Sequence, residues 1–237
     1  MARKRTTLVS DAVEYIRNKI LSYELRPGSA ISDNKIALEM TEELNVNISR
    51  SPVREALMIL QADGLVEMID GKMCVARITD RDVFELCQVR DVIEQQSVAI
   101  VMDGGGFTEE QKAELKRCYQ KLEQATNDKI NDASVYHIDD EFHLYLVSCT
   151  GNNRLVDIAK RMCNQMKRVR WLNMIIPNRR KEANLEHKEI MDAILNNDRA
   201  HAIEAIHAHN LKTQTNFHQI FESEELRKAI VNLLVDK

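Results

Sequence analysis

The sequence has few of the residues that interrupt helices. Its 237 residues include three prolines and seven glycines, whereas 30% are charged and 44% are hydrophobic. This composition is typical of mostly helical proteins. The length falls between one and two typical domains, and the hydrophobic fraction is sufficient to form helical cores.

The sequence also lacks the patterns of secreted, zinc-thiolate and membrane proteins. Its five cysteines, an odd number, contain no Cys-x-x-Cys pair, which argues against a disulfide framework and a thiolate zinc site. The N-terminus has no hydrophobic region like that of a signal peptide, and no apolar run approaches the ~18 residues that a membrane span needs. We therefore expect a cytoplasmic protein that does not enter a membrane.

A large basic surface is also absent. Residues 1–77 contain 11 Lys+Arg and 11 Asp+Glu, and the whole chain has a formal net charge of -4. Binding to nucleic acid would have to come from a local cluster of basic side chains, which dimerisation would double.

Such a cluster is present in the segment Ser49-Arg50-Ser51-Pro52-Val53-Arg54-Glu55-Ala56-Leu57. A serine can cap a helix, and a proline is tolerated in the first turn because the amides there have no partner within the helix. Helix N-termini favour phosphate, and arginine reads guanine edges in the major groove. The segment predicts the start of a DNA-recognition helix, although an ordinary surface helix would also fit it.

The surrounding elements predict a winged helix-turn-helix domain in residues 1–77. A helix is expected over 10–21, followed by the turn Arg26-Pro27-Gly28, a second helix from about Asp33, and the recognition helix. Strands at 66–69 and 73–76, around Asp70-Gly71-Lys72, would form the wing. We expect DNA contacts from the start of the recognition helix and from the wing turn. The residues that make them would be Ser49, Arg50, Ser51, Arg54, Gly71 and Lys72.

Residues 78–237 have a different character and predict an all-helical domain. Apolar residues recur at helical spacing, and no strand pattern competes. We expect an antiparallel bundle whose helices cover 80–102, 108–126, 131–149, 153–175, 179–196 and 199–220.

Four polar residues fall on the core-facing sides of these helices. Asp139 and His143 are one turn apart, whereas His187 and His209 lie eleven residues on either side of Asp198, the expected turn between two antiparallel helices. The two imidazoles should therefore reach the same height. A divalent cation bound by Asp139 and three neutral imidazoles would offset the cost of burying the carboxylate, and Zn, Ni, Mn or Fe would suit these ligands. Ordinary core histidines are the alternative.

The first domain resembles the GntR family of bacterial transcription regulators. The resemblance covers residues 8–77 and rests on the strings 25–32 (LRPGSAIS), 49–57 (SRSPVREAL) and 63–66 (DGLV). Two departures are visible. The run from Asn34 to Ile48 is longer than in the family, and Asn34 stands where the family often has an arginine that touches DNA. The resemblance implies a homodimer that binds an inverted repeat, more often as a repressor than as an activator.

The second domain resembles the FCD effector domain of the FadR-like branch of that family. The matching strings are 139–143 (DDEFH), 150–155 (TGNNRL), 186–190 (EHKEI) and the segment 198–209, within residues 80–220. The resemblance implies a metal held by Asp139, His143, His187 and His209, and a small carboxylate effector. Arg90 matches a frequent position in this domain and could bind the effector, or instead form a salt bridge with Glu94.

Two other functions remain compatible with the sequence. The Asp-His-His-His set could activate water in a metalloenzyme whose N-terminal domain is accessory. The metal could also serve only to stabilise the bundle.

Overall fold

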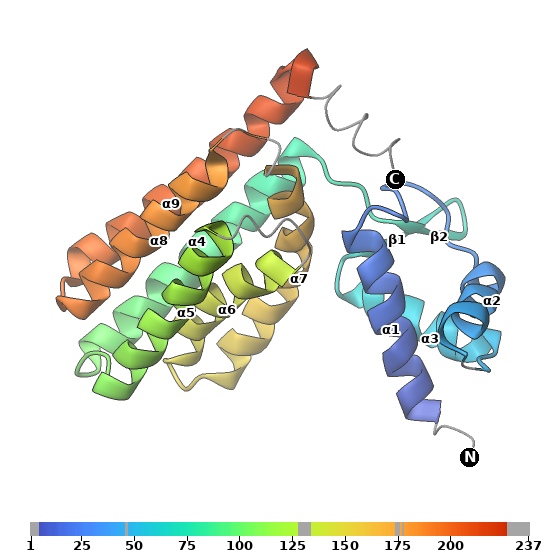
Figure 1. Cartoon of the computed structure of the whole chain (residues 1–237), viewed down its shortest axis with the longest axis horizontal. Helices are drawn as coiled ribbons and strands as arrows, with labels where there is room; N and C mark the ends of the chain where they lie inside the picture. Colours follow the sequence, from blue (N-terminus) through green and yellow to red (C-terminus); the bar gives the residue numbers. More distant parts are fainter. Residues whose placement is uncertain (1–4, 46, 128–133, 174–175, 177, 227–237) are drawn as a thin grey trace. The chain divides into compact units, whose positions relative to one another are not determined.

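The computed structural model describes residues 5–45, 47–127, 134–173, 176 and 178–226. These residues form nine α-helices longer than ten residues and one two-stranded sheet, and the chain divides into two compact units between Ile78 and Thr79 (Figure 1). Each unit has its own hydrophobic core. None of the described helices combines the length and the apolar composition required to cross a membrane.

The first unit contains α1 (Arg5–Leu21), α2 (Asp33–Leu44) and α3 (Arg50–Ala62). Helix α1 begins five residues before the predicted start at Ser10. The Ser32 hydroxyl accepts a hydrogen bond from the Lys35 amide and so caps α2. A core of fully buried side chains joins the helices, and includes Ile16, Met40, Leu60 and Leu65.

Helix α3 begins next to Ser49, which has extended backbone angles but makes no capping hydrogen bond through its side chain. Pro52 is its third residue, where the missing amide proton costs no hydrogen bond within the helix. One face of α3 is buried in the core by Val53, Ala56, Leu57 and Leu60. The opposite face is exposed and contains Arg50, Arg54 and Met58 at intervals of four residues.

The wing consists of β1 (Val66–Ile69) and β2 (Lys72–Val75), which pair in antiparallel fashion. Asp70 and Gly71 both have positive φ, 48° and 75°, as a two-residue hairpin turn of type I′ requires. The predicted three-residue turn was wrong by one position: Lys72 pairs with Ile69 and begins the second strand. Gly71 therefore lies at the tip, with Lys72 beside it.

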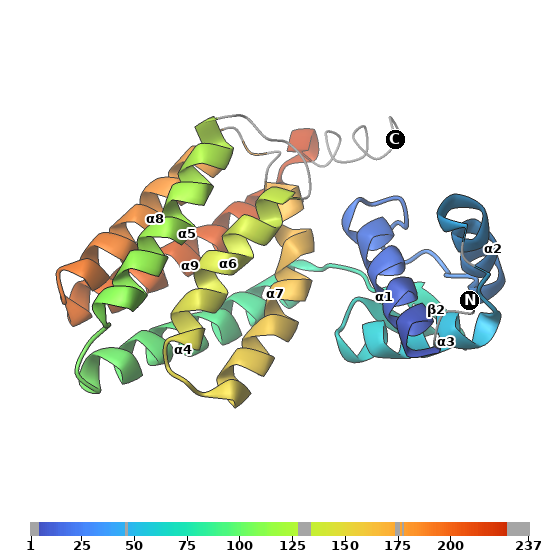
Figure 2. The same cartoon turned by 60° about the horizontal axis from the view of Figure 1, so that its bottom comes forward.

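The second unit consists of six helices, which Figures 1 and 2 show running alongside one another. They are α4 (Asp80–Asp103), α5 (Glu109–Asn127), α6 (Ser134–Ser148), α7 (Asn153–Asn173), α8 (Arg179–Leu195) and α9 (Arg199–Glu222). Thr79 and Asp82 form a capping box at the start of α4, and Asp198 caps α9 directly after the α8–α9 turn. The predicted bounds agree closely, although predicted positions 131–133 and 174–175 lie outside the described residues.

The core of this unit encloses a polar centre. Phe142, Ile190, Ile194 and Ile206 are fully buried, as expected for a helical core. Several polar side chains are buried among the helices to nearly the same extent, and at most 3% of each residue is exposed in Arg90, Glu94, His143, His187 and His209. Because buried polar groups are costly without partners, their mutual contacts determine what this unit can bind.

The positive φ angle of Gly71 allows the assigned wing turn to be tested by substitution. A Cβ built on Gly71 meets no atom within 4 Å, so a substitution there is penalised by its positive φ and not by a steric clash. Gly71→Val should lower the stability of the N-terminal unit by about 1–2 kcal/mol, whereas Gly71→Asn should cost much less because asparagine tolerates this conformation. Calorimetric unfolding of both variants checks the difference, and equal losses would contradict the assigned turn.

Candidate metal centre and DNA interface

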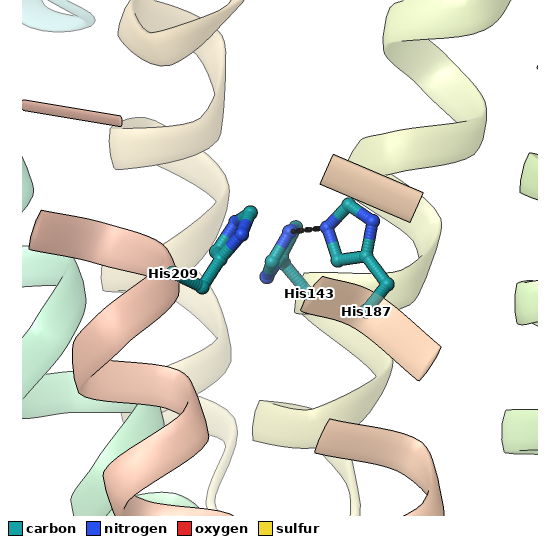
Figure 3. Close-up of side chains that lie close together, drawn as sticks. All are labelled: His143, His187 and His209. Atoms are coloured by element: carbon teal, nitrogen blue, oxygen red, sulfur yellow. Dashed lines mark hydrogen bonds between the residues drawn. The ribbon is translucent and has the colours of Figure 1, made fainter. Parts of the chain in front are cut away.

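Three imidazoles from three different helices meet at the polar centre of the second unit (Figure 3). His143 of α6, His187 of α8 and His209 of α9 have ring centroids 4.6–5.2 Å apart. One ring nitrogen from each lies within 4.8 Å of the other two. The capped turn at Asp198 makes α8 and α9 an antiparallel hairpin, so His187 and His209 reach the same height, as their equal spacing from Asp198 predicted.

Asp139 adds a carboxylate to the three imidazoles. Its Oδ2 lies 3.7 Å from His143 Nε2, and its Oδ1 lies 3.6 Å from His187 Nε2. The two Nε2 atoms are 2.9 Å apart. Nitrogen ligands at about 2.1 Å from one ion lie about 3 Å or slightly more from each other, so the His143 and His187 nitrogens already have a spacing that one ion accepts. The structure thus brings together all four residues predicted as ligands.

Two carboxylates lie behind the cluster, a buried one from Glu94 and a partly buried one from Glu186, and neither contact with a histidine was predicted from the sequence. Glu94 Oε1 lies 3.0 Å from His143 Nδ1, and Glu186 Oε2 lies 2.6 Å from His209 Nδ1. Arg179 holds Glu186 through two bonds of 2.8 Å. The carboxylate hydrogen-bonded to His209 Nδ1 favours a proton on that nitrogen and leaves His209 Nε2 free to bind a metal. Since these contacts join different turns and helices, no local sequence pattern identifies them.

Burial keeps the three imidazoles neutral. It lowers the pKa of His187 to about 3 and that of His143 well below 6.5, with the Arg90 charge acting in the same direction on both. Burial also lowers the pKa of His209. Partial burial alone would raise the pKa of Glu186, but its bonds to His209 and Arg179 outweigh that effect and lower the pKa to about 2. Neutral imidazoles are the protonation state that metal binding needs.

Arg90 of α4 lies against the cluster and also forms the alternative salt bridge. Its Nε donates to Glu94 Oε1 at 2.9 Å. Its Nη2 lies 3.2 Å from His209 Nε2 and in very short contact with His143 Nε2. The guanidinium therefore occupies the side of the cluster to which two of the ligand nitrogens point.

The residues predicted to contact DNA lie on the surface of the first unit. Ser49, Ser51, Gly71 and Lys72 are exposed, and the side chains of Arg50 and Arg54 are 52% and 63% exposed. Both arginines bind the carboxylate of Asp33, the first residue of α2, to which the sequence had given no role. Arg50 and Arg54 thus share one partner at the N-terminal end of α3.

Two family models match the chain. The model described as bacterial regulatory proteins of the gntR family covers residues 8–75, and the FCD domain model covers residues 85–212, more than half of the chain.

Curated relatives are also regulators. An uncharacterised HTH-type transcriptional regulator of Bacillus subtilis, YdhC, is 25% identical over 82% of this chain and 84% of its own. Two relatives at 23% identity differ in their direction of control. The Glc operon transcriptional activator of Escherichia coli is matched over 98% of both chains, and the gluconate operon transcriptional repressor of Bacillus licheniformis over 89% of this chain and 85% of its own.

Solved structures share the fold. Escherichia coli McbR/YncC, at 18% identity, superposes with a TM-score of 0.73 over 90% of this chain and 98% of its own. The metal-free FCD domain of TM0439 covers 62% of this chain and 100% of its own, at 19% identity and a TM-score of 0.51. The matched models and the regulators among its relatives show that the chain belongs to the GntR family, in the branch with an FCD domain, and is a DNA-binding transcription regulator rather than an enzyme.

Proposed function

We propose that the chain is a cytoplasmic repressor whose affinity for an operator depends on a small carboxylate effector bound at a divalent metal in the helical unit. The single observation that carries the effector site is the convergence of three neutral imidazoles and Asp139 beside Arg90. Repression is the commoner mode in the family, and one of the relatives is named as a repressor. A metalloenzyme is not favoured, since the relatives are regulators.

The exposed face of α3 is the proposed reading surface. Its two arginines extend from the helix end where backbone amides favour phosphate, and arginine can form two hydrogen bonds to one guanine. Lys72 of the wing is exposed and carries a single charge suited to the phosphate backbone. Base reading and backbone anchoring are thereby assigned to different residues.

This division predicts different defects for the two kinds of residue. Arg50→Ala or Arg54→Ala should remove about 1–3 kcal/mol of discrimination between a selected and a shuffled duplex. Lys72→Ala should weaken binding to both duplexes about equally. It should also reduce the salt slope, which is the dependence of log affinity on log salt concentration, by about one ion. Fluorescence anisotropy at several salt concentrations measures both effects. Full discrimination by the arginine variants would contradict the reading surface.

The residues present fit a divalent metal. Three neutral nitrogens and one carboxylate are donors that Zn, Ni, Mn and Fe accept, and the Glu186 carboxylate favours Nε2 as the metal-binding atom of His209. The similar FCD domain of TM0439 is described as metal-free, which supports treating metal loading as a variable property of such domains.

Arg90 is the proposed anchor of the effector. The Nε2 lone pairs of His143 and His209 cannot be given to Arg90 and to a metal at the same time, so a loaded site requires the guanidinium to give up these contacts. The freed N–H groups would then face the open coordination positions. A carboxylate that completes the metal shell can accept hydrogen bonds from the same guanidinium, which explains why an organic acid suits this centre.

Metal content tests the site directly. His187→Ala, His209→Ala and Asp139→Asn should each greatly reduce the metal bound per chain, because each removes a ligand while the other ligands stay buried. His201→Ala and His218→Ala are matched controls, since those imidazoles are exposed and bind Glu189 and Asp80. Elemental analysis of purified protein, with mass spectrometry of co-purified acids, provides the measurement. Equal metal content in both groups would overturn the site.

A homodimer is proposed to present two winged helices to an inverted repeat. The face between α4 and α7 suits a second copy. Its exposed apolar side chains are Val89 and Ile158, with Val92 about one turn further along α4, and they are exposed by 46%, 50% and 68%, respectively. The adjoining groove has Asp82 and Glu85 on the α4 side and Arg161 on the α7 side. A twofold axis could place the acidic side of one copy against the basic side of the other.

The dimer is tested by a charge introduced among the exposed apolar side chains of this face. Val92→Glu should shift the chain from dimer to monomer, because it would bury an unpaired carboxylate. Leu185→Glu is the control, since Leu185 on α8 is 67% exposed, about as much as Val92. Light scattering across a dilution series measures the mass. A dimer that persists with Val92→Glu would exclude this face.

A further inference from the structure

Asp33 contacts both arginines of the reading surface on α3. Its Oδ2 accepts a hydrogen bond from Arg54 Nε at 2.5 Å, and both of its oxygens contact Arg50 at 3.2–3.3 Å. The Asp33 side chain is 16% exposed, whereas those of both arginines are more than half exposed. A largely covered carboxylate therefore fixes two guanidinium groups that project toward solvent.

The geometry leaves the reading edges of the arginines available. Arg54 uses only Nε on Asp33, and within the described part of the chain its two terminal nitrogens make no hydrogen bond. Arg50 uses Nε and Nη2, which leaves Nη1 on its outer side. Bidentate recognition of guanine needs two N–H groups on one edge, and Arg54 presents such an edge.

The Asp33 carboxyl group is held in its ionised form by the two arginines. Partial burial alone would raise the pKa of its carboxyl group, but the hydrogen bonds from Arg54 and Arg50 outweigh that effect and lower the pKa below 3.8. Both contacts are thus charge-assisted and directional.

We propose that Asp33 is a positioning residue that sets sequence selectivity by holding Arg50 and Arg54 in the geometry that reads bases. The proposal rests on the reading surface assigned above. Free arginine side chains lose rotamer entropy when they bind a base, and a side chain already held by Asp33 loses less. Asp33 also cancels one of the two positive charges, so it reduces the attraction to any DNA, whatever its sequence.

Removing the Asp33 charge should therefore lower selectivity for the selected sequence but raise the affinity for DNA of any sequence. A variant that merely disturbs the fold would not combine these two changes. Asp33→Asn should lower the ratio of affinities for a selected and a shuffled duplex about tenfold, since ordering is lost for two side chains. The same variant should bind shuffled DNA more tightly at low salt, with a salt slope steeper by about one ion. A structural defect would weaken both duplexes together.

The chain offers a matched control in Asp63. Its side chain is 17% exposed and forms a salt bridge with Arg17 at 3.1 Å, within the same unit but at the far end of α3. Asp63→Asn removes the same charge and a similar contact, and should leave the affinity ratio unchanged. Asp33→Glu keeps the charge but moves it by one methylene group, and should reduce the ratio while the salt slope stays the same.

The experiment uses the full chain, a duplex that it selects from a random pool, and a shuffled duplex of equal length, with anisotropy at several salt concentrations. A reduced ratio in Asp33→Asn, absent in Asp63→Asn and absent when Arg50 and Arg54 are already alanine, supports the proposal. An unchanged ratio in Asp33→Asn and Asp33→Glu overturns it. If Arg50→Ala and Arg54→Ala also keep the ratio, the reading surface itself fails. If circular dichroism shows that Asp33→Asn does not fold, the affinity ratio of Asp33→Glu tests the proposal by itself: a reduced ratio supports it and an unchanged ratio overturns it.

Discussion

Polar side chains at the centre of a helical unit must find partners within it, because water does not reach them in bulk. In the second unit this constraint connects four helices to a single centre. His143, His187 and His209 come from α6, α8 and α9, and Arg90 and Glu94 come from α4. A separate buried contact, from Asn184 of α8 to the Leu122 carbonyl, follows the same rule between α8 and α5. The protonation of each ring therefore depends on how these helices pack around it.

A carboxylate–guanidinium pair also occurs at the surface of the first unit. A carboxylate holds a guanidinium through directional bonds and thereby aims its remaining N–H groups, whether the pair is Glu94 with Arg90 or Asp33 with Arg54. The two pairs differ in how much of the arginine side chain is exposed to solvent. The Arg90 side chain is 1% exposed and can meet only a ligand that enters the centre, whereas Arg54 is 63% exposed and can meet a macromolecule. Under the proposed function, one kind of ion pair would serve a small acid in the second unit and a DNA duplex in the first.

Much of this organisation follows from local sequence patterns. Helical periodicity and capping residues predicted all six helices of the second unit, and the equal spacing of His187 and His209 from Asp198 predicted that their rings would meet. The roles of Asp33, Glu94 and Glu186 were not predictable in the same way. Asp33 contacts residues 17 and 21 positions away, and His209 is 23 positions from Glu186. Such pairings depend on how the helices pack, which periodicity alone does not specify. The wing turn was misplaced by one residue because Lys72 suits a turn and a strand equally well.

The helices that form the proposed centre also suggest how it could control DNA binding. Helix α4 starts at Asp80, directly after the first unit ends, and carries Arg90 and Glu94 within four turns of that start. Helix α9 carries His209 to the centre, and nine residues later its His218 bonds Asp80 at 2.9 Å. A ligand that moves Arg90 therefore acts on a pair of helices joined both at the centre and at the start of α4. Control requires the effector to bind one arrangement of this pair more tightly than another, because equal affinity would shift no population. Under the proposed function, the displacement of Arg90 from His143 and His209 would supply that difference, since its contacts with the two imidazoles and with an effector would exclude each other.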